Sequence, residues 1–236
     1  MQVDDGNDSS YNAMLVSLNH RLDKHFSVLT NYTWSHCIGD GDVQSEITGG
    51  YQDPNNRQGS RGNCYTDVRQ LFNLSMVAEA PHFRGNWIKR LAGDWELSAI
   101  ATARSGFWVT PGTGIDSSFT GVGADRPNVV GDPVLANPTL AKWFNTGAFV
   151  QNAAGTYGNA GRSSIQGPGS FNMDMSLMRH IVVRERQYFE IRAEAFNVLN
   201  HPTFQNPGTT QSSQNFGRVL AANDPRILQF AVKFVF

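Results

Sequence analysis

Three charged side chains stand at every second position in the last quarter of the chain: Glu190, Arg192 and Glu194. Successive side chains of a strand point to opposite faces, so these three would share one face, and apolar residues would fill the other. Such a row can neutralise itself or line a polar path for a ligand, and Arg69 is a further candidate for either role. We favour self-neutralisation, because pairing in a water-filled interior adds no cost. The alternating apolar residues are Phe189, Ile191, Ala193 and Ala195.

The two cysteines, Cys37 and Cys64, lie at the two ends of one predicted loop. Exported proteins pass through oxidising compartments, where one bridge would close that loop at its base. We therefore expect a disulfide, with two free thiols as the alternative. A zinc site that uses His36 is disfavoured, because the C-x-x-C spacing of structural zinc sites is missing.

Oxygen-rich clusters in the same loop, Asp40-Gly-Asp42 and Asp53-Pro-Asn-Asn56, could hold calcium. The twelve-residue EF-hand pattern is absent, so solvated turns are the simpler interpretation, and no metal site is expected.

No pattern of an enzyme or of a cofactor site stands out. The six histidines are scattered, and neither H-E-x-x-H nor G-x-S-x-G occurs. The glycine clusters lack the strand-to-helix spacing of phosphate loops. The formal net charge is -1, without a basic run, so no nucleic-acid partner is expected.

The charged row belongs to one of several ranges in which large apolar residues alternate with smaller or polar ones. Each range is about 9–13 residues long, close to the length that a tilted strand needs to cross a bilayer. No apolar run approaches the roughly 18 residues of a membrane helix. The predicted strands lie near 11–19, 26–35, 66–78, 94–104, 171–182, 187–199 and 226–236.

Short and long gaps alternate between these strands. Antiparallel neighbours put successive connections at opposite ends, so all the long loops, 36–65, 105–170 and 200–225, would share one side. Outer-membrane barrels have short periplasmic turns and long external loops. We expect an all-β antiparallel meander of about seven transmembrane strands in the outer membrane, with the C-terminus on the periplasmic side.

Two groups of aromatic residues remain. The last strand alternates Phe230, Val232, Phe234 and Phe236, which is typical of the C-terminal signature that barrel-assembly machinery recognises and of a strand whose one face contacts lipid. The loop 105–170 carries more aromatic residues than a solvated loop needs. They either pack the loop on itself or contact an external ligand; candidates are Phe107, Trp108, Trp143 and Phe144.

Several motifs together resemble the C-terminal half of TonB-dependent outer-membrane receptors, in particular the Oar-like group with a carboxypeptidase-regulatory-like domain. The resemblance implies a barrel of about 22 strands with an internal plug, which imports an unidentified small ligand and is energised by the TonB system. The plug and the N-terminal part of the barrel are absent here. The motifs include Tyr32-Thr-Trp-Ser35, Trp95-Glu-Leu-Ser98, Trp143-Phe-Asn145, Arg192-Ala-Glu-Ala-Phe-Asn-Val-Leu-Asn-His-Pro-Thr-Phe204 and Phe216-Gly-Arg218.

Seven strands cannot close a barrel, so the resemblance predicts a partial barrel segment. The alternative is a secreted or surface-exposed soluble β-sandwich with a structural or adhesive role. In that case the apolar faces would pack on one another as a dry core.

Overall fold

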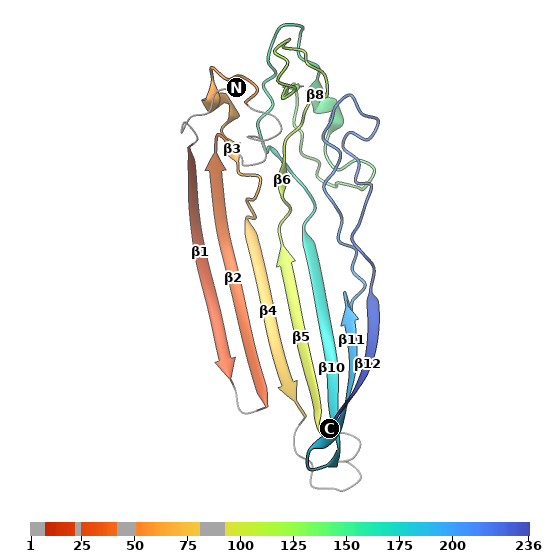
Figure 1. The fold of residues 1–236 in the computed structure, drawn as a ribbon. Helices are drawn as coiled ribbons and strands as arrows, with labels where there is room; N and C mark the ends of the chain where they lie inside the picture. The colour runs from red at the N-terminus through yellow and green to blue at the C-terminus, as the bar shows by residue number, and fades with distance from the viewer. Residues whose placement is uncertain (1–7, 22–24, 42–50, 81–92) are drawn as a thin grey trace.

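The computed structural model describes residues 8–21, 25–41, 51–80 and 93–236. Its main element is one antiparallel sheet whose seven long strands stand side by side in chain order (Figure 1). Each long strand overlaps one of the predicted ranges, and the predicted all-β meander is confirmed. The strands are β1 (Ser9–Arg21), β2 (Phe26–Gly39), β4 (Gln70–Glu79), β5 (Trp95–Arg104), β10 (Ser170–Arg184), β11 (Gln187–Phe196) and β12 (Ile227–Val235).

The short elements lie in the long loops. A 3-10 helix, η1 (Arg57–Ser60), and β3 (Gly62–Asn63) belong to the first loop, and β3 pairs with the end of β2. In the second loop, β6 (Trp108–Val109) pairs with β9 (Ile165–Gln166), and β7 (Asn128–Val129) pairs with β8 (Phe149–Val150). A second 3-10 helix, η2 (Thr146–Ala148), precedes β8 directly.

The strand register brings the apolar rows together on one face of the sheet. Val16 lies opposite Tyr32, which lies opposite Phe72, and Phe72 lies opposite Ala103. On the C-terminal side, Leu97 lies opposite Leu177, Leu177 opposite Ala193, and Ala193 opposite Phe230. Directly opposed residues share a face, so all seven alternating patterns agree with one another. We call this the apolar face, and the other the polar face.

The connections divide between the two ends of the sheet, and the long loops gather at one end (Figure 1). At the opposite end only Glu185 and Arg186 join β10 to β11. Val235 pairs with Tyr188 close to that turn, so the C-terminal strand finishes at the end of the short connections.

Two predicted strand boundaries in the first loop are wrong. β2 does not end at residue 35 but continues to Gly39, because β3 returns along it and supplies backbone partners to Ile38 and Gly39. β4 starts at Gln70 rather than at 66, because the preceding turn is held by Asp67. The Asp67 carboxylate accepts a hydrogen bond from the Cys37 amide at 2.7 Å.

The predicted strand 187–199 is also too long, since β11 stops at Phe196. Asn197 adopts a left-handed conformation with φ of 51°, which asparagine tolerates better than most residues. Its amide donates to the Asp174 carboxylate at 2.8 Å, and its own side-chain oxygen accepts from the His201 amide at 2.9 Å. Asn197 therefore turns the chain out of the sheet and into the third long loop.

The loops have a hydrophobic core of their own, separate from the sheet. Phe144, Phe149 and Phe216 meet edge to face, with ring centroids 5.0 to 5.7 Å apart. Ala148, Ala160 and Ile165 complete the buried cluster. This core joins the second and third long loops, so the loop 105–170 is a folded layer rather than a solvated strand connection.

No second large sheet covers the apolar face within the part of the chain that the structure describes. Phe230 and Val232 are 76% and 70% exposed. The soluble β-sandwich with a dry core between two sheets is therefore wrong. Among the described residues there is also no helix that is both long and apolar enough to span a membrane.

Replacing Val232 by Arg tests the assignment of the two faces. Val232 lies near the middle of β12 on the apolar face, which the sequence predicts to contact lipid, where a charge costs about 2–4 kcal/mol. We expect a lower urea midpoint in bilayers and less SDS-resistant folded protein. The control is Gln229→Arg, which lies on the polar face opposite Glu194 and should change either quantity little. Equal losses for the two variants would contradict the face assignment.

Candidate functional site

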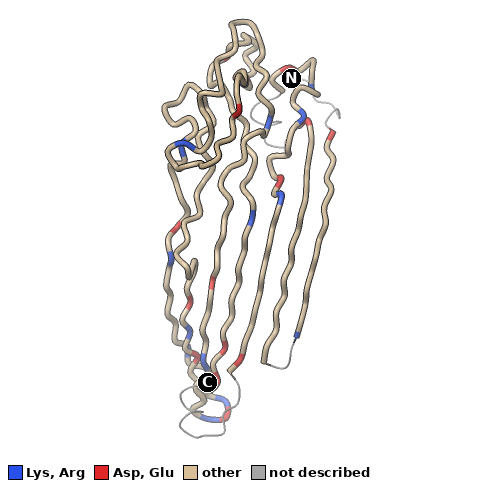
Figure 2. Tube along the Cα trace, turned by 180° about the vertical axis from the view of Figure 1, so that it is seen from behind, with Lys and Arg blue, Asp and Glu red and all other residues tan. Residues whose placement is uncertain are grey.

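Charged residues inside the long strands concentrate on β10, β11 and β12. Within β1, β2, β4 and β5, charged side chains occur only at or next to a strand end, as the tube in Figure 2 shows. The charges of β11 are the row Glu190, Arg192 and Glu194, which lies on the polar face. On the polar face, the middle parts of the C-terminal strands therefore carry charges, whereas the middle parts of β1, β2, β4 and β5 do not.

The row on β11 forms a connected network. The Arg192 guanidinium lies 2.6 Å from a Glu190 carboxylate oxygen and 3.6 Å from one of Glu194. His180 of β10 lies 3.5 Å from the other oxygen of Glu190, and Lys233 of β12 stands opposite Glu190 in the register. Two carboxylates thus face two permanent cations and one histidine. The charged groups of the row are thus in contact with one another and with their neighbours on β10.

Arg179 is the charged exception on the apolar face of β10. Its guanidinium lies 5.3 Å from the centre of the Trp95 ring, and the two residues are directly opposed in the register. Both stand near the end of the sheet that carries the short connections, where aromatic residues and long cationic side chains reach the headgroups of a bilayer.

Arg69, the fourth predicted charged candidate, does not belong to the row. It precedes β4 and donates to the Asn63 side chain at 3.2 Å and to the Asp67 carboxylate at 3.3 Å. Its guanidinium also lies 5.8 Å from the centre of the Trp108 ring. The candidates therefore form two separate sites, the row on β11 and a site where the sheet meets the loops.

A disulfide joins Cys37 to Cys64, as the sequence predicts. It links Cys37, near the end of β2, to Cys64 in the segment before β4. The Cys64 amide donates to the Cys37 carbonyl at 3.0 Å. In the chain-entropy model, closing a loop of this length stabilises the folded state by about 3–4 kcal/mol, because it lowers the entropy of the unfolded chain. The bridge therefore fixes the place at which the first long loop leaves the sheet.

Two arginines of the second loop fasten it to the first. Arg162 donates to the carbonyls of Ser60 and Gly39, and Arg126 donates to the Gly59 carbonyl at 2.9 Å. Burial lowers the pKa of Arg126, and the nearby positive charge of Arg162 lowers it further. Both side chains bind backbone oxygens, so they act as clamps between loops.

In the same loop, hydrogen bonds to the Asp116 carboxylate, of which that from the Gly121 amide has the largest effect, lower the pKa of Asp116.

The four aromatic candidates of the second loop have different surroundings. Phe144 is 3% exposed in the loop core, and Trp143 packs against that core while its indole N–H donates to the Gln166 carbonyl at 2.8 Å. These two residues pack the loop on itself, so the external-ligand alternative is wrong for Phe144. Phe107 lies 4.0 Å from the Arg104 guanidinium, and Trp108 lines a cavity.

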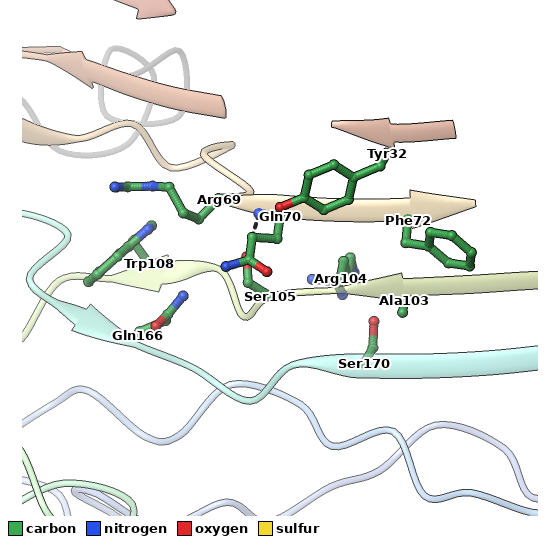
Figure 3. Close-up of a pocket in the computed structure, with 10 residues that line it drawn as sticks. All are labelled: Tyr32, Arg69, Gln70, Phe72, Ala103, Arg104, Ser105, Trp108, Gln166 and Ser170. Atoms are coloured by element: carbon green, nitrogen blue, oxygen red, sulfur yellow. Dashed lines mark hydrogen bonds between the residues drawn. The ribbon is translucent and has the colours of Figure 1, made fainter. Parts of the chain in front are cut away.

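That cavity, of about 470 Å³, lies where β2, β4, β5 and β10 meet the second loop (Figure 3). Its walls combine aromatic rings, two guanidinium groups and uncharged polar side chains. Sequence reasoning missed Arg104 and Gln166, which are far apart in the chain and carry no motif. The lining residues are Tyr32, Arg69, Gln70, Phe72, Ala103, Arg104, Ser105, Trp108, Gln166 and Ser170.

The sheet, its one-sided loops and its two chemically distinct faces can be set beside known proteins. The family model of the outer membrane beta barrel domain matches residues 1–229. The chain belongs to this family. A search of the curated proteins finds no match, and a search of the solved structures finds none either.

Membership in the outer membrane beta barrel family identifies an outer-membrane protein. It also indicates what each face of the sheet contacts. In barrels of this kind the outward face of alternating apolar residues contacts lipid, and the more polar face lines the barrel interior. The row on β11 is then a lumen feature, and the cavity lies at the loop end of the wall. Asp42 of the first oxygen-rich cluster lies outside the described residues; among those described, no group of three or more His, Cys, Asp or Glu could hold a metal ion.

A double-mutant cycle tests whether the β11 row acts as a network. Arg192→Met should destabilise the folded barrel by about 1–3 kcal/mol, because two partly buried carboxylates lose their shared partner. Combined with Glu190→Gln, the loss should be smaller than the sum, with a coupling energy of about 0.5–3 kcal/mol. Unfolding midpoints in lipid measure both. Arg218→Met, on an exposed loop residue, is the control, and strict additivity would argue against the network.

Proposed function

We propose that this chain is the C-terminal barrel portion of a TonB-dependent outer-membrane receptor of the Oar-like kind, which takes up a small ligand through a plugged barrel. The observation that carries the proposal is the segment 192–204. It contains Arg192 and Glu194 of the charged row, and its Asn197 turns the chain from β11 into the third long loop. The order of the motifs along the chain supports the same assignment.

The orientation follows from the loops. External loops of such barrels are long and capture ligands, whereas periplasmic turns are short. In this proposal the folded loop layer faces the exterior, and the C-terminal strand ends on the periplasmic side. A loop layer held by a disulfide and by arginine clamps offers a preformed surface, which lowers the entropic cost of binding.

The partners in this proposal match its parts. Outer-membrane lipid covers the apolar face, and barrel-assembly machinery recognises the alternating aromatic strand at the C-terminus. In this proposal the TonB system supplies energy through the plug and the N-terminal segments of the receptor to which this barrel portion belongs. The chain itself performs no chemical reaction in this scheme, and its role is to bind and to form the wall of the path.

Energy dependence separates a plugged receptor from an open pore. The protein isolated from the outer membrane should show no steady conductance in planar bilayers, because a plug fills the lumen. In cells, uptake that depends on this protein should stop when a protonophore collapses the inner-membrane energy source. Nutrient pools compared between a deletion strain and its complemented parent reveal which uptake depends on it. Steady open-pore conductance, or uptake that survives the protonophore, would contradict the proposal.

A further inference from the structure

Three of the residues that line the cavity at the junction of the sheet and the second loop carry donors without acceptors. Arg69 Nε, Arg104 Nη1 and Trp108 Nε1 are buried side-chain nitrogens that have no hydrogen-bond partner among the described residues (Figure 3). A buried donor that has lost water and gained no acceptor is destabilising, so three such donors on the residues that line one cavity call for a common acceptor.

The charge of the cavity points to the same acceptor. Two arginines line it, and neither aspartate nor glutamate does. Arg69 has the Asp67 carboxylate at 3.3 Å, but no ion pair joins Arg104 to a carboxylate among the described residues. Arg104 has instead the Phe107 ring at 4.0 Å, which stabilises a cation without neutralising it. The lining therefore carries an excess positive charge.

We propose that this cavity binds a small organic oxyanion. Its carboxylate or phosphate oxygens accept hydrogen bonds from Arg104, Arg69 Nε and the Trp108 indole. Guanidinium groups match the geometry of such oxygens, and charge-assisted bonds of this kind are about twice as strong as neutral ones. Tyr32, Phe72 and Trp108 supply walls for the apolar part of the ligand. The volume of about 470 Å³ falls within the range of small-molecule sites.

Two sources can deliver this chemistry. A soluble anion can enter from the exterior past the loops. A lipid can also place its phosphate here, because Tyr32, Phe72 and Ala103 belong to the apolar face at the loop end of the wall. The site does not depend on transport, so its failure would leave the proposed function untouched.

The binding test uses the intact protein extracted from the outer membrane in a phosphate-free glycoside detergent. Phenyl phosphate and benzoate are the probes, and benzyl alcohol is the neutral control of similar size. Calorimetric titration and quenching of tryptophan fluorescence should show saturable binding of both anions, weakened by added salt, and no saturable binding of benzyl alcohol. Equal binding of the neutral compound, or binding of no probe, would overturn the proposal.

Two variants locate the site. Arg104→Met should weaken phenyl phosphate binding roughly ten- to hundredfold, as expected for losing hydrogen bonds to a charged group. Trp108→Phe keeps an aromatic side chain but removes the indole N–H together with the five-membered ring, so it should weaken binding severalfold while the protein stays folded. Arg218→Met is the matched control and should bind like the unmodified protein. Unchanged affinity in Trp108→Phe and in folded Arg104→Met would sink the proposal.

Competition identifies the source. Short-chain phosphatidic acid that displaces phenyl phosphate at a lower concentration than benzoate does would assign the site to a membrane lipid. Displacement that requires a higher concentration would assign it to a soluble anion. Both results require the same oxyanion contacts, and both should be lost together in Arg104→Met. Displacement that persists in that variant would place the lipid elsewhere and contradict the shared site.

Discussion

The whole structure depends on keeping one two-residue alternation in common register across seven strands. A slip of a single residue in any strand pair would turn that strand's apolar row to the opposite face. For β11 such a slip would carry Glu190, Arg192 and Glu194 into lipid and turn Phe189 and Ile191 toward the lumen. The ion-pair row and the lipid-facing surface are therefore not separate features, because each fixes the register that the other needs.

The loop end of the sheet follows from where β2 and β4 stop. The disulfide and the Asp67 hydrogen bonds hold the ends of these strands together, and Arg162 then ties the second loop to the same place. The points at which the loops leave the sheet are thereby fixed. The aromatic core of Phe144, Phe149 and Phe216 packs within the loop layer, beyond the end of the sheet. The cavity lined by Trp108 lies where the strand ends meet the loop layer, and side-chain nitrogens of Arg69, Arg104 and Trp108 have no hydrogen-bond partner there in the part of the chain that the structure describes.

The sequence was sufficient to predict which residues share a face of the sheet, but not where each strand begins and ends. Alternation is a local signal, so the apolar rows, the charged row and the cysteine pair could all be predicted. Strand ends depend on partners distant in the chain: Gly62 and Asn63 extend β2, and Asp67 delays β4. The cavity was hidden for the same reason, since Arg69, Arg104 and Gln166 meet only after the loop folds. Composition could likewise not separate Phe144, which is buried in the loop core, from Trp108, which lines the cavity.

The central claim is that the bulky side of the sheet touches lipid. Spin labels placed singly along β12, in the protein assembled in its own membrane, report this directly through collisions with oxygen, which concentrates in lipid, and with a water-soluble nickel chelate. The account predicts that positions 230, 232 and 234 collide with oxygen, and that positions 229, 231 and 233 collide with the nickel chelate, with a period of two residues. The reverse phase, or shielding of positions 230 to 234 from both reagents as in a protein core, would contradict it.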